Sequence, residues 1–167
     1  MRVGVISDTH DRLESIDLAV NLFNQEGVEH VFHAGDIISP FAVLRFQPLK
    51  ARLHLVWGNN DGDKLLLAKK ISEMGATVHG SFMNLTLAGR RIAMTHGTRE
   101  EVVNALARCG EYDLVIRGHT HRPEVRTEGK TLIVNPGAAS GYLTEEETVA
   151  IIDLETMRVE IRPLRPK

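Results

Sequence analysis

Five short segments of the sequence carry side chains that bind metal ions, and each segment directly follows an apolar run. They are Asp8-Thr9-His10, Gly35-Asp36, Gly58-Asn59-Asn60-Asp61, His96-Gly97 and Gly118-His119-Thr120-His121. The set is rich in carboxylate and imidazole and contains no thiolate. Such donors suit divalent Mn²⁺, Fe²⁺, Zn²⁺ or Ni²⁺ rather than a structural zinc site. If the segments meet in space, the chemistry is that of divalent cations.

Each segment alone has an ordinary interpretation. Asp-x-His and Gly-Asp are common in turns, and Gly-Asn-Asn-Asp suits a turn because Asn and Asp tolerate unusual dihedral angles. A single histidine such as His96 is more often structural than a ligand. The five segments together favour one shared site over coincidence.

Other polar residues lack this context. Trp57 is predicted to be core or pocket wall, and the run Glu145-Glu146-Glu147 to be a solvated turn. Arg12 and Arg122 border the motifs and could bind phosphate, although exposed arginines are more often ordinary surface groups. No metal role is predicted for His30, His33, His54 and His79.

The first half of the sequence alternates strands and helices. Each predicted strand is followed by a polar loop and a helix, and the strands are 3–6, 30–34 and 52–57. The helices are predicted over 13–26 with Gly27 as its end, from Ser39-Pro40 to about 47, and from the cap Asp63 to Met74. This repeated order implies a parallel sheet with crossover helices.

The second half is richer in hairpins. Strands are predicted at 77–80, 81–87, 91–95, 114–117, 125–128, 130–134, 148–153 and 157–163. Ala88-Gly89 connects a tight hairpin, and Thr98 with Glu101 forms a capping-box pattern that opens a helix to about Arg108. No linker or repeat divides residues 1–167, so we expect one domain of two packed β-sheets flanked by helices.

This arrangement brings the five segments together. In open α/β sheets the loops at the carboxyl ends of the strands form the binding crevice. Two ions about 3.5–4 Å apart need an anionic group between them, and a carboxylate such as Asp36 can give one oxygen to each. The side chains expected to converge are those of Asp8, His10, Asp36, Asn59, His96, His119 and His121.

Composition limits the other function classes. The 167 residues are 43% hydrophobic and 25% charged, with 20 basic and 22 acidic side chains and a formal net charge of −2. This balance argues against a protein built to coat nucleic acid or an anionic membrane. One cysteine, Cys109, forms no internal disulfide, no signal peptide is expected because residues 1–8 turn polar early, and no apolar run approaches about 20 residues. A cytoplasmic protein is expected.

In this order the segments resemble the signature of the calcineurin-like metallophosphoesterase superfamily: D-x-H, G-D, G-N-x-D, H-G and G-H-x-H. Over essentially its whole length the chain looks most like the small YfcE-type phosphodiesterases, whose turn Asn135-Pro136-Gly137 it also shares. The resemblance implies an α/β (α+β) fold, a four-layer αββα sandwich of two mixed β-sheets flanked by helices.

The resemblance also implies which residues hold which ion. One ion is expected on Asp8, His10, Asp36 and His121, and the other on Asp36, Asn59, His96 and His119. Mn²⁺ is the first expectation, with Ni²⁺, Fe²⁺ and Zn²⁺ as alternatives. The implied reaction is hydrolysis of a small phosphodiester by a metal-bridging hydroxide that attacks phosphorus in line.

One position departs from the superfamily pattern. In the larger phosphatases a histidine, assigned to protonation of the leaving group, stands where this chain has Asn60. Asn60 can donate a hydrogen bond to a phosphoryl oxygen but cannot act as a general acid at neutral pH. Diesters with acidic leaving groups are therefore expected to react best. Asp61 is expected to orient a neighbouring ligand.

Two other functions remain open on the sequence. A phosphomonoesterase or a nucleotide pyrophosphohydrolase could use the same site. A protein-binding scaffold of the retromer-subunit type has the same fold with its metal ligands partly lost, whereas every ligand position is filled here. The hairpin-rich half could offer an edge for a homodimer.

Overall fold

The computed structural model describes residues 1–165, whose strands form a six-stranded sheet A and a five-stranded sheet B. Sheet A has the order β11-β10-β1-β2-β3-β4, and its strands are β1 (Arg2–Ile6), β2 (His30–His33), β3 (Arg52–Leu55), β4 (Thr77–Val78), β10 (Thr148–Asp153) and β11 (Arg158–Pro163). Sheet B has the order β5-β6-β7-β9-β8, and its strands are β5 (Phe82–Leu87), β6 (Arg90–Thr95), β7 (Leu114–Ile116), β8 (Pro123–Glu128) and β9 (Thr131–Pro136).

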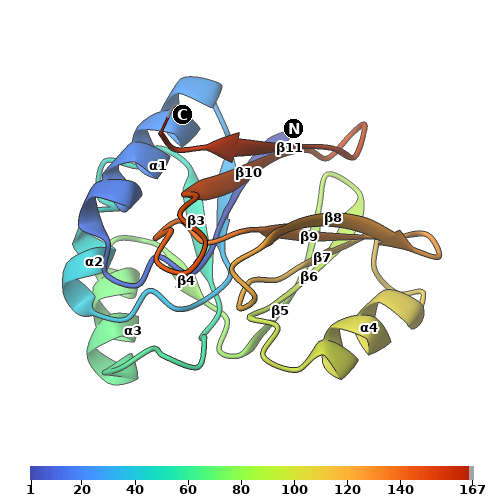
Figure 1. The fold of residues 1–167 in the computed structure, drawn as a ribbon, viewed down its shortest axis with the longest axis horizontal. Coiled ribbons are helices and arrows are strands. Elements are labelled where there is room, and N and C mark those ends of the chain that lie inside the picture. Colours follow the sequence, from blue (N-terminus) through green and yellow to red (C-terminus); the bar gives the residue numbers. More distant parts are fainter. Residues whose placement is uncertain (166–167) are drawn as a thin grey trace.

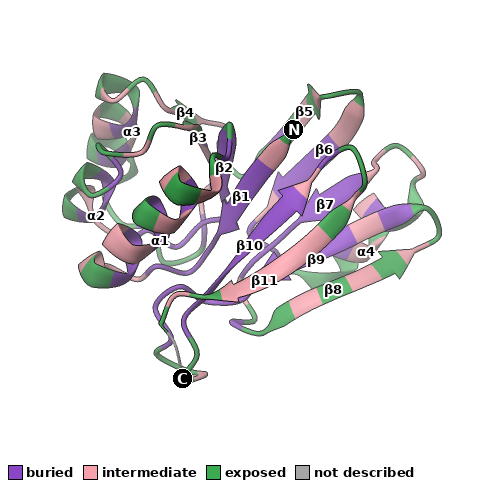
Figure 2. Cartoon of the chain, turned by 90° about the horizontal axis from the view of Figure 1, so that it is seen from above, coloured by how far each residue is buried: buried purple, intermediate pink, exposed green. Residues whose placement is uncertain are grey.

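The helices cover the outer faces of the two sheets (Figure 1). On one side, α1 (Leu13–Glu26), α2 (Pro40–Leu44) and α3 (Lys64–Glu73) pack against sheet A, and on the other α4 (Glu100–Arg108) packs against sheet B. Besides the apolar contacts under the helices, a core lies between the two sheets. It is built from alternate side chains such as those of Val5, Phe32, Met94 and Ile116. Figure 2 shows the buried strands at this centre and the exposed outer turns of the helices. The predicted four-layer αββα sandwich is confirmed.

Both sheets are mixed, and their parallel strands carry the predicted ligand loops. In sheet A, β1 pairs in parallel with β2, β2 with β3, and β3 with β4, whereas β10 and β11 are antiparallel. In sheet B, β6 pairs in parallel with β7, and β7 with β9. The five donor segments follow β1, β2, β3, β6 and β7. Their position at the carboxyl ends of strands is therefore as predicted.

Caps fix several helix ends as the sequence predicts. Gly27 ends α1 in the left-handed conformation, with φ of 64°. Asp63 caps α3 by accepting a hydrogen bond of 3.0 Å from the N–H of Leu66. None of the helices within residues 1–165 has both the length and the apolar composition needed to cross a membrane.

Three predicted elements differ from the structure. The capping box at Thr98 is wrong, because α4 begins one residue later: its N-cap is Arg99, with no side-chain cap, and Glu100 in the first turn pairs with Arg117 and Arg126. Helix α2 ends at Leu44 and continues to Gln47 only as hydrogen-bonded turns. Strand β4 is two residues long rather than four, because sheet A ends there and no further strand pairs with it.

Candidate metal centre

The structure brings the seven predicted donor residues into one cluster. The Oδ1 atom of Asp8 lies 3.4 Å from Nε2 of His121, 3.8 Å from Nε2 of His10 and 4.0 Å from Nε2 of His96. The Oδ2 atom of Asp36 lies 3.4 Å from Nε2 of His96 and 3.6 Å from Nε2 of His10. Donor atoms from four separate loops therefore meet around two carboxylates.

The remaining two residues complete the side of the cluster around His96. Oδ1 of Asn59 lies 3.0 Å from Nε2 of His96, and the ring of His119 meets the ring of His96 edge to face at 5.1 Å. Two groups have the spacing of a metal site: Asp8 with His10 and His121, and Asp8 with Asp36 and His96. Asp8 thus reaches both groups, as Asp36 was expected to do.

The donor atoms fit a cation because several acceptors face one another. Nδ1 of His96 lies 2.7 Å from the carbonyl of Ala34, which fixes the imidazole proton on Nδ1 and leaves a lone pair on Nε2 that faces the Asn59 oxygen. Oδ1 of Asp8 is buried and has no hydrogen-bond partner. Buried acceptors without a donor are costly, and a positive ion between them removes that cost.

The ligand loops hold strained backbone. Five of the seven donor residues have a left-handed φ between 42° and 71°, namely Asp8, His10, Asp36, His119 and His121. Such a conformation is uncommon outside glycine and costs about 1–3 kcal/mol per residue. Strain concentrated on one set of side chains indicates that their positions are needed for function.

Two glycines are required by the close approach of these loops. A Cβ at Gly58 would overlap the carboxylate of Asp36, and a Cβ at Gly118 would overlap Ser7 and the carboxylate of Asp8. Only glycine lets the backbone pass so near the two central carboxylates. The prediction that glycines beside the ligands permit tight approach is confirmed at these positions.

Asp61 and Asn60 hold Asp36 from two sides. The carboxylate of Asp61 accepts hydrogen bonds from the backbone N–H groups of Asp36, Gly58 and Ile38, at 3.2, 2.7 and 2.9 Å. Asn60 donates its backbone N–H and its side-chain amide to the Asp36 carboxylate, both at 2.8 Å. Asn60 therefore contacts the predicted metal ligand, whereas its contact with a phosphate stays a prediction.

Ser7 and Asn135 also position the centre, and neither was predicted to do so. Ser7 donates a hydrogen bond of 2.6 Å to Oδ2 of Asp8, which leaves Oδ1 as the free oxygen. Asn135 donates from its amide to the carbonyl of Gly118 and to the hydroxyl of Thr120, both at 3.0 Å. The Asn135-Pro136-Gly137 turn was the one sequence signal of the Asn135 contacts, and no sequence pattern indicated the contact of Ser7 with Asp8.

Charge pairing keeps the central carboxylates ionised. Burial raises the pKa of Asp8, but the neighbouring imidazoles of His10 and His121 and the hydrogen bond from Ser7 outweigh it and hold the pKa well below its usual range. Burial likewise opposes ionisation of Asp36, yet the neighbouring imidazole of His96 and the hydrogen bonds from Asn60 lower its pKa to about 2. Two anions beside several imidazoles are therefore available at neutral pH.

An open cavity of about 510 Å³ borders the centre on the side of His96. It is lined by aromatic and aliphatic groups together with one cation, including Trp57, Phe82, Val102 and Arg99. The prediction that Trp57 is core or pocket wall is confirmed. The cavity can accept the organic part of a small molecule whose polar group reaches His96.

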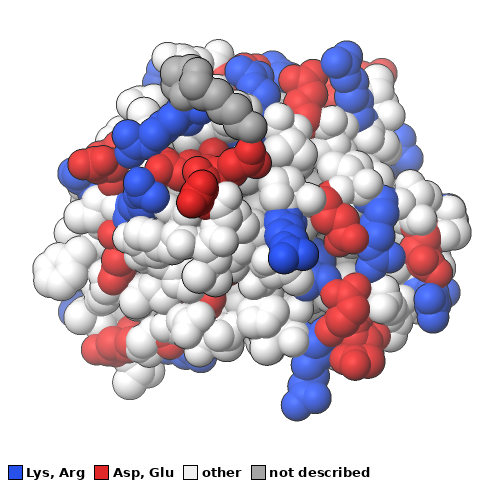
Figure 3. All heavy atoms as spheres, viewed as in Figure 1, with Lys and Arg blue, Asp and Glu red and all other residues white. Residues whose placement is uncertain are grey.

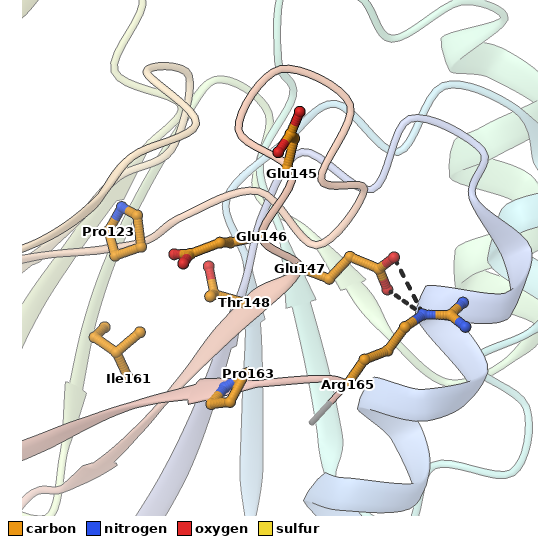
Figure 4. Close-up of a pocket in the computed structure, with 8 residues that line it drawn as sticks. All are labelled: Pro123, Glu145, Glu146, Glu147, Thr148, Ile161, Pro163 and Arg165. Carbon is orange, nitrogen blue, oxygen red and sulfur yellow. Dashed lines mark hydrogen bonds and ion pairs between the residues drawn. The ribbon is translucent and has the colours of Figure 1, made fainter. Parts of the chain in front are cut away.

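The predicted surface turn at residues 145–147 is wrong for Glu147, which is 9% exposed. Its carboxylate pairs with Arg12 at 2.8 Å and with Arg165 at 3.1 Å, and Ser15 donates a hydrogen bond to it. Figure 4 shows Glu147 and Arg165 at the edge of a cavity of about 470 Å³. Because Arg12 is held by Glu147, a contact of Arg12 with phosphate would compete with this ion pair, while Arg122 is exposed.

Comparison with known protein sequences gives a consistent group of relatives. A family model described as the calcineurin-like phosphoesterase superfamily domain matches residues 1–157. The phosphodiesterase MJ0936 of Methanocaldococcus jannaschii is 36% identical over 156 residues, which cover 93% of this chain and 94% of that protein. The phosphodiesterase YfcE of Escherichia coli is 26% identical over 155 residues, which cover 84% of this chain and 80% of that protein.

Solved structures show the same architecture. The structure of an archaeal phosphodiesterase matches with a TM-score of 0.94 and 34% identity over 98% of this chain and 99% of that one. Vps29 of Entamoeba histolytica matches with a TM-score of 0.70 and 18% identity over 99% of this chain and 100% of that one. At such low identity the second likeness extends to the fold alone.

Proposed function

Because the chain belongs to the calcineurin-like phosphoesterase superfamily, we propose that it is a metal-dependent phosphodiesterase that hydrolyses small phosphodiesters. Its membership confirms the resemblance seen in the five sequence motifs, and the phosphodiesterases among its relatives support the activity. One observation of the structure carries the proposal. Strained loops aim imidazoles at two ionised carboxylates, one of which keeps a buried oxygen without a partner.

We propose that two divalent ions bind the seven donor side chains. One would be held by Asp8, His10, Asp36 and His121, and the other by Asp36, Asn59, His96 and His119. Bound ions would supply a water of lowered pKa and positive charge for the phosphoryl oxygens. Mn²⁺ is the proposed metal, because the carboxylate and amide oxygens suit it, while the imidazoles also accept Ni²⁺, Fe²⁺ or Zn²⁺.

The chain's own residues fix the geometry of the reaction. The carboxylate of Asp36 lies 3.4 Å from His96 and 3.6 Å from His10, and Asp36 is held by Asn60 on its carboxylate and by Asp61 on its backbone. Asp8 is held by Ser7 and by the backbone N–H of His119, at 2.6 and 3.0 Å. Positions fixed in this way cost no reorganisation when charge develops on the phosphoryl group.

The leaving group is proposed to occupy the cavity beside His96. Its walls include the rings of Trp57 and Phe82, which suit an aromatic or other apolar substituent, and Arg99 provides a positive charge. Asn60 stands at the position of the superfamily acid and has no proton to transfer near neutral pH. Aryl diesters, whose leaving groups depart without a proton, are therefore the expected best substrates.

The rate on a bis-aryl phosphodiester tests this proposal. After chelator treatment the rate should fall to background, and added Mn²⁺ should restore it. An unchanged rate without metal would contradict a metal-dependent reaction. Matched aryl monoester, aryl diester and dinucleotide substrates then separate a phosphodiesterase from a phosphomonoesterase or a nucleotide pyrophosphohydrolase.

A protein-binding scaffold is the second candidate from the sequence, and the filled donor set argues against it. All seven donor positions carry a side chain that can bind a metal, and these side chains lie together. A scaffold has no need of strained ligand loops. Metal analysis of the purified protein separates the two functions, because a scaffold need hold no ion.

We further propose that residues 1–167 act as one domain in the cytoplasm on small phosphoesters. Basic and acidic side chains are interspersed on the face seen in Figure 3, which offers no extended basic surface for nucleic acid. A homodimer through an exposed strand edge remains a proposal, and the molar mass in solution tests it.

A further inference from the structure

Three histidines outside the candidate centre form a row across sheet A. His30 begins β2, His54 lies in β3, and His79 directly follows β4 at the edge of the sheet. Nδ1 of His30 lies 3.0 Å from Nε2 of His54, and Nδ1 of His54 lies 3.1 Å from Nε2 of His79. The rings are stacked, with centroids 5.2 and 5.4 Å apart. We call these three residues the histidine row.

The two contacts have the length of N–H···N hydrogen bonds, and the same spacing also suits two nitrogens that bind one ion. Two nitrogens each about 2.0–2.1 Å from one ion are roughly 2.8–3.4 Å apart when the angle between them is between square and tetrahedral. In the candidate centre, Nε2 of His10 and Nε2 of His121 are 3.3 Å apart. The histidine row therefore repeats the nitrogen spacing of the proposed centre.

The row differs from the centre in its donor chemistry. Among residues 1–165, no carboxylate forms an ion pair with any of its three rings, so only neutral nitrogens are offered. Burial lowers the pKa of all three histidines, to about 4 for His54, which keeps their lone pairs free at neutral pH. Imidazole donors without carboxylate favour Ni²⁺, Cu²⁺ or Zn²⁺ over Mn²⁺.

We propose that the histidine row binds one divalent ion of this nitrogen-preferring class, through Nδ1 of His54 and Nε2 of His79. Both rings are half-buried, and β4 is an edge strand, so water can complete the coordination. His30 is only 9% exposed and serves as the outer partner. With its proton on Nε2, His54 donates to Nδ1 of His30, and this tautomer leaves its Nδ1 free for the ion.

The three imidazoles of the histidine row can stay neutral when the ion binds, and none of them has to lose a proton. Each neutral imidazole keeps one proton: His54 on Nε2, His79 on Nδ1 and His30 on Nε2. His54 is shared by both close pairs, so the row holds one ion rather than two. The guanidinium of Arg52 lowers the pKa of His30 and His54 and also opposes a cation, but its side chain is exposed and its field is screened by solvent.

Nickel binding to the untagged, chelator-treated protein tests the proposal. Metal analysis after gel filtration should find one more Ni²⁺ than Mn²⁺ per chain. His54→Gln and His79→Gln should each lose that additional Ni²⁺ while keeping the bound Mn²⁺ and the hydrolysis rate. His30→Gln should retain the ion with affinity weakened about tenfold, as expected for an outer partner.

Several outcomes would overturn the proposal. They are an equal number of Ni²⁺ and Mn²⁺ ions in the wild type, retention of the additional ion in His79→Gln, or its complete loss in His30→Gln alone. If His54→Gln does not fold, His79→Gln at the sheet edge provides the same comparison. The difference between variant and wild type is read from Ni²⁺ counts, so it does not depend on the proposed phosphodiesterase activity.

Discussion

The candidate centre and the histidine row place imidazole nitrogens at similar distances on very different backbone. In the centre, His10, His119 and His121 lie in loops after strands and have a left-handed φ. In the row, His30 and His54 belong to regular strands, where parallel neighbours bring their side chains together. The strained loops also deliver two carboxylates, which strands of this sheet do not. The comparison indicates that strain serves to mix donor types rather than to bring histidines close.

Removal of Asp36, the carboxylate proposed to bind both ions, gives the largest expected difference between the two regions. Asp36→Ala should lower kcat/KM on an aryl diester on the order of 10³-fold, the scale for loss of one preorganised electrostatic group. His54→Gln should leave that rate unchanged, because its ring lies in the row. The rates of both variants at the same excess of added Mn²⁺ provide the measurement. Equal losses in both variants would mean that the two regions are not independent.

A methyl group at Gly58 should break the centre without removing a ligand. Its Cβ would overlap the Asp36 carboxylate, so Gly58→Ala should weaken Mn²⁺ binding about 100-fold, at the upper end of effects on ligand orientation. Gly62→Ala is the matched control, because its Cβ would meet only the Ile38 carbonyl at 3.4 Å. Calorimetric titration with Mn²⁺ compares the two, and similar affinities would contradict the steric argument.

Asp61 should affect the centre less than the ligands do. Asp61→Asn replaces one accepting oxygen with a donor that faces backbone N–H groups, which should cost about 1–3 kcal/mol of unfolding free energy. Mn²⁺ affinity should fall about tenfold, because Asp36 loses its backbone support. Asp63→Asn, at the exposed cap of α3, should lower neither the Mn²⁺ affinity nor the rate. Urea unfolding and Mn²⁺ titration check both variants.

The histidine row should produce the smallest effect, a change of stability with pH. Because the folded-state pKa of His54 is about 4 against 6.5 when unfolded, the unfolded chain binds more protons between these values. Its contribution to stability is therefore complete above pH 6.5 and is lost as the pH falls towards 4. In His54→Gln the free energy of unfolding should therefore fall by about 1 kcal/mol less than in the wild type as the pH is lowered, after allowance for solvent screening. Urea unfolding at pH 4.5 and 7.5 measures the free energy of unfolding of both proteins. The same change with pH in variant and wild type would contradict the assignment.

The sequence predicts the centre better than it predicts the surroundings of the centre. Asp8, Asp36 and Asn59 could be found because each follows a short apolar run, and parallel strands carry their ends to one edge. The glycines beside them indicated close backbone approach. Local patterns of this kind predict position because the chain between a strand and its loop is short.

Long-range contacts explain what the sequence could not predict. Glu147 was expected in a solvated turn, yet it pairs with Arg12, 135 positions away in the chain, and with Arg165. The capping-box pattern at Thr98 gave no sign that Glu100, in the first turn of α4, pairs with Arg117. The nitrogen contacts of the histidine row depend on the register of three strands, so its members looked isolated in sequence.

Anomalous diffraction from crystals of the protein grown with Mn²⁺ tests the central claim most directly. Two Mn²⁺ peaks about 3.5–4 Å apart are predicted, one beside Asp8, His10 and His121 and the other beside Asn59, His96 and His119, with Asp36 between them. In crystals of Asp36→Ala both peaks should disappear. Two peaks that persist in that variant, or Mn²⁺ found only away from these side chains in the wild type, would contradict the account.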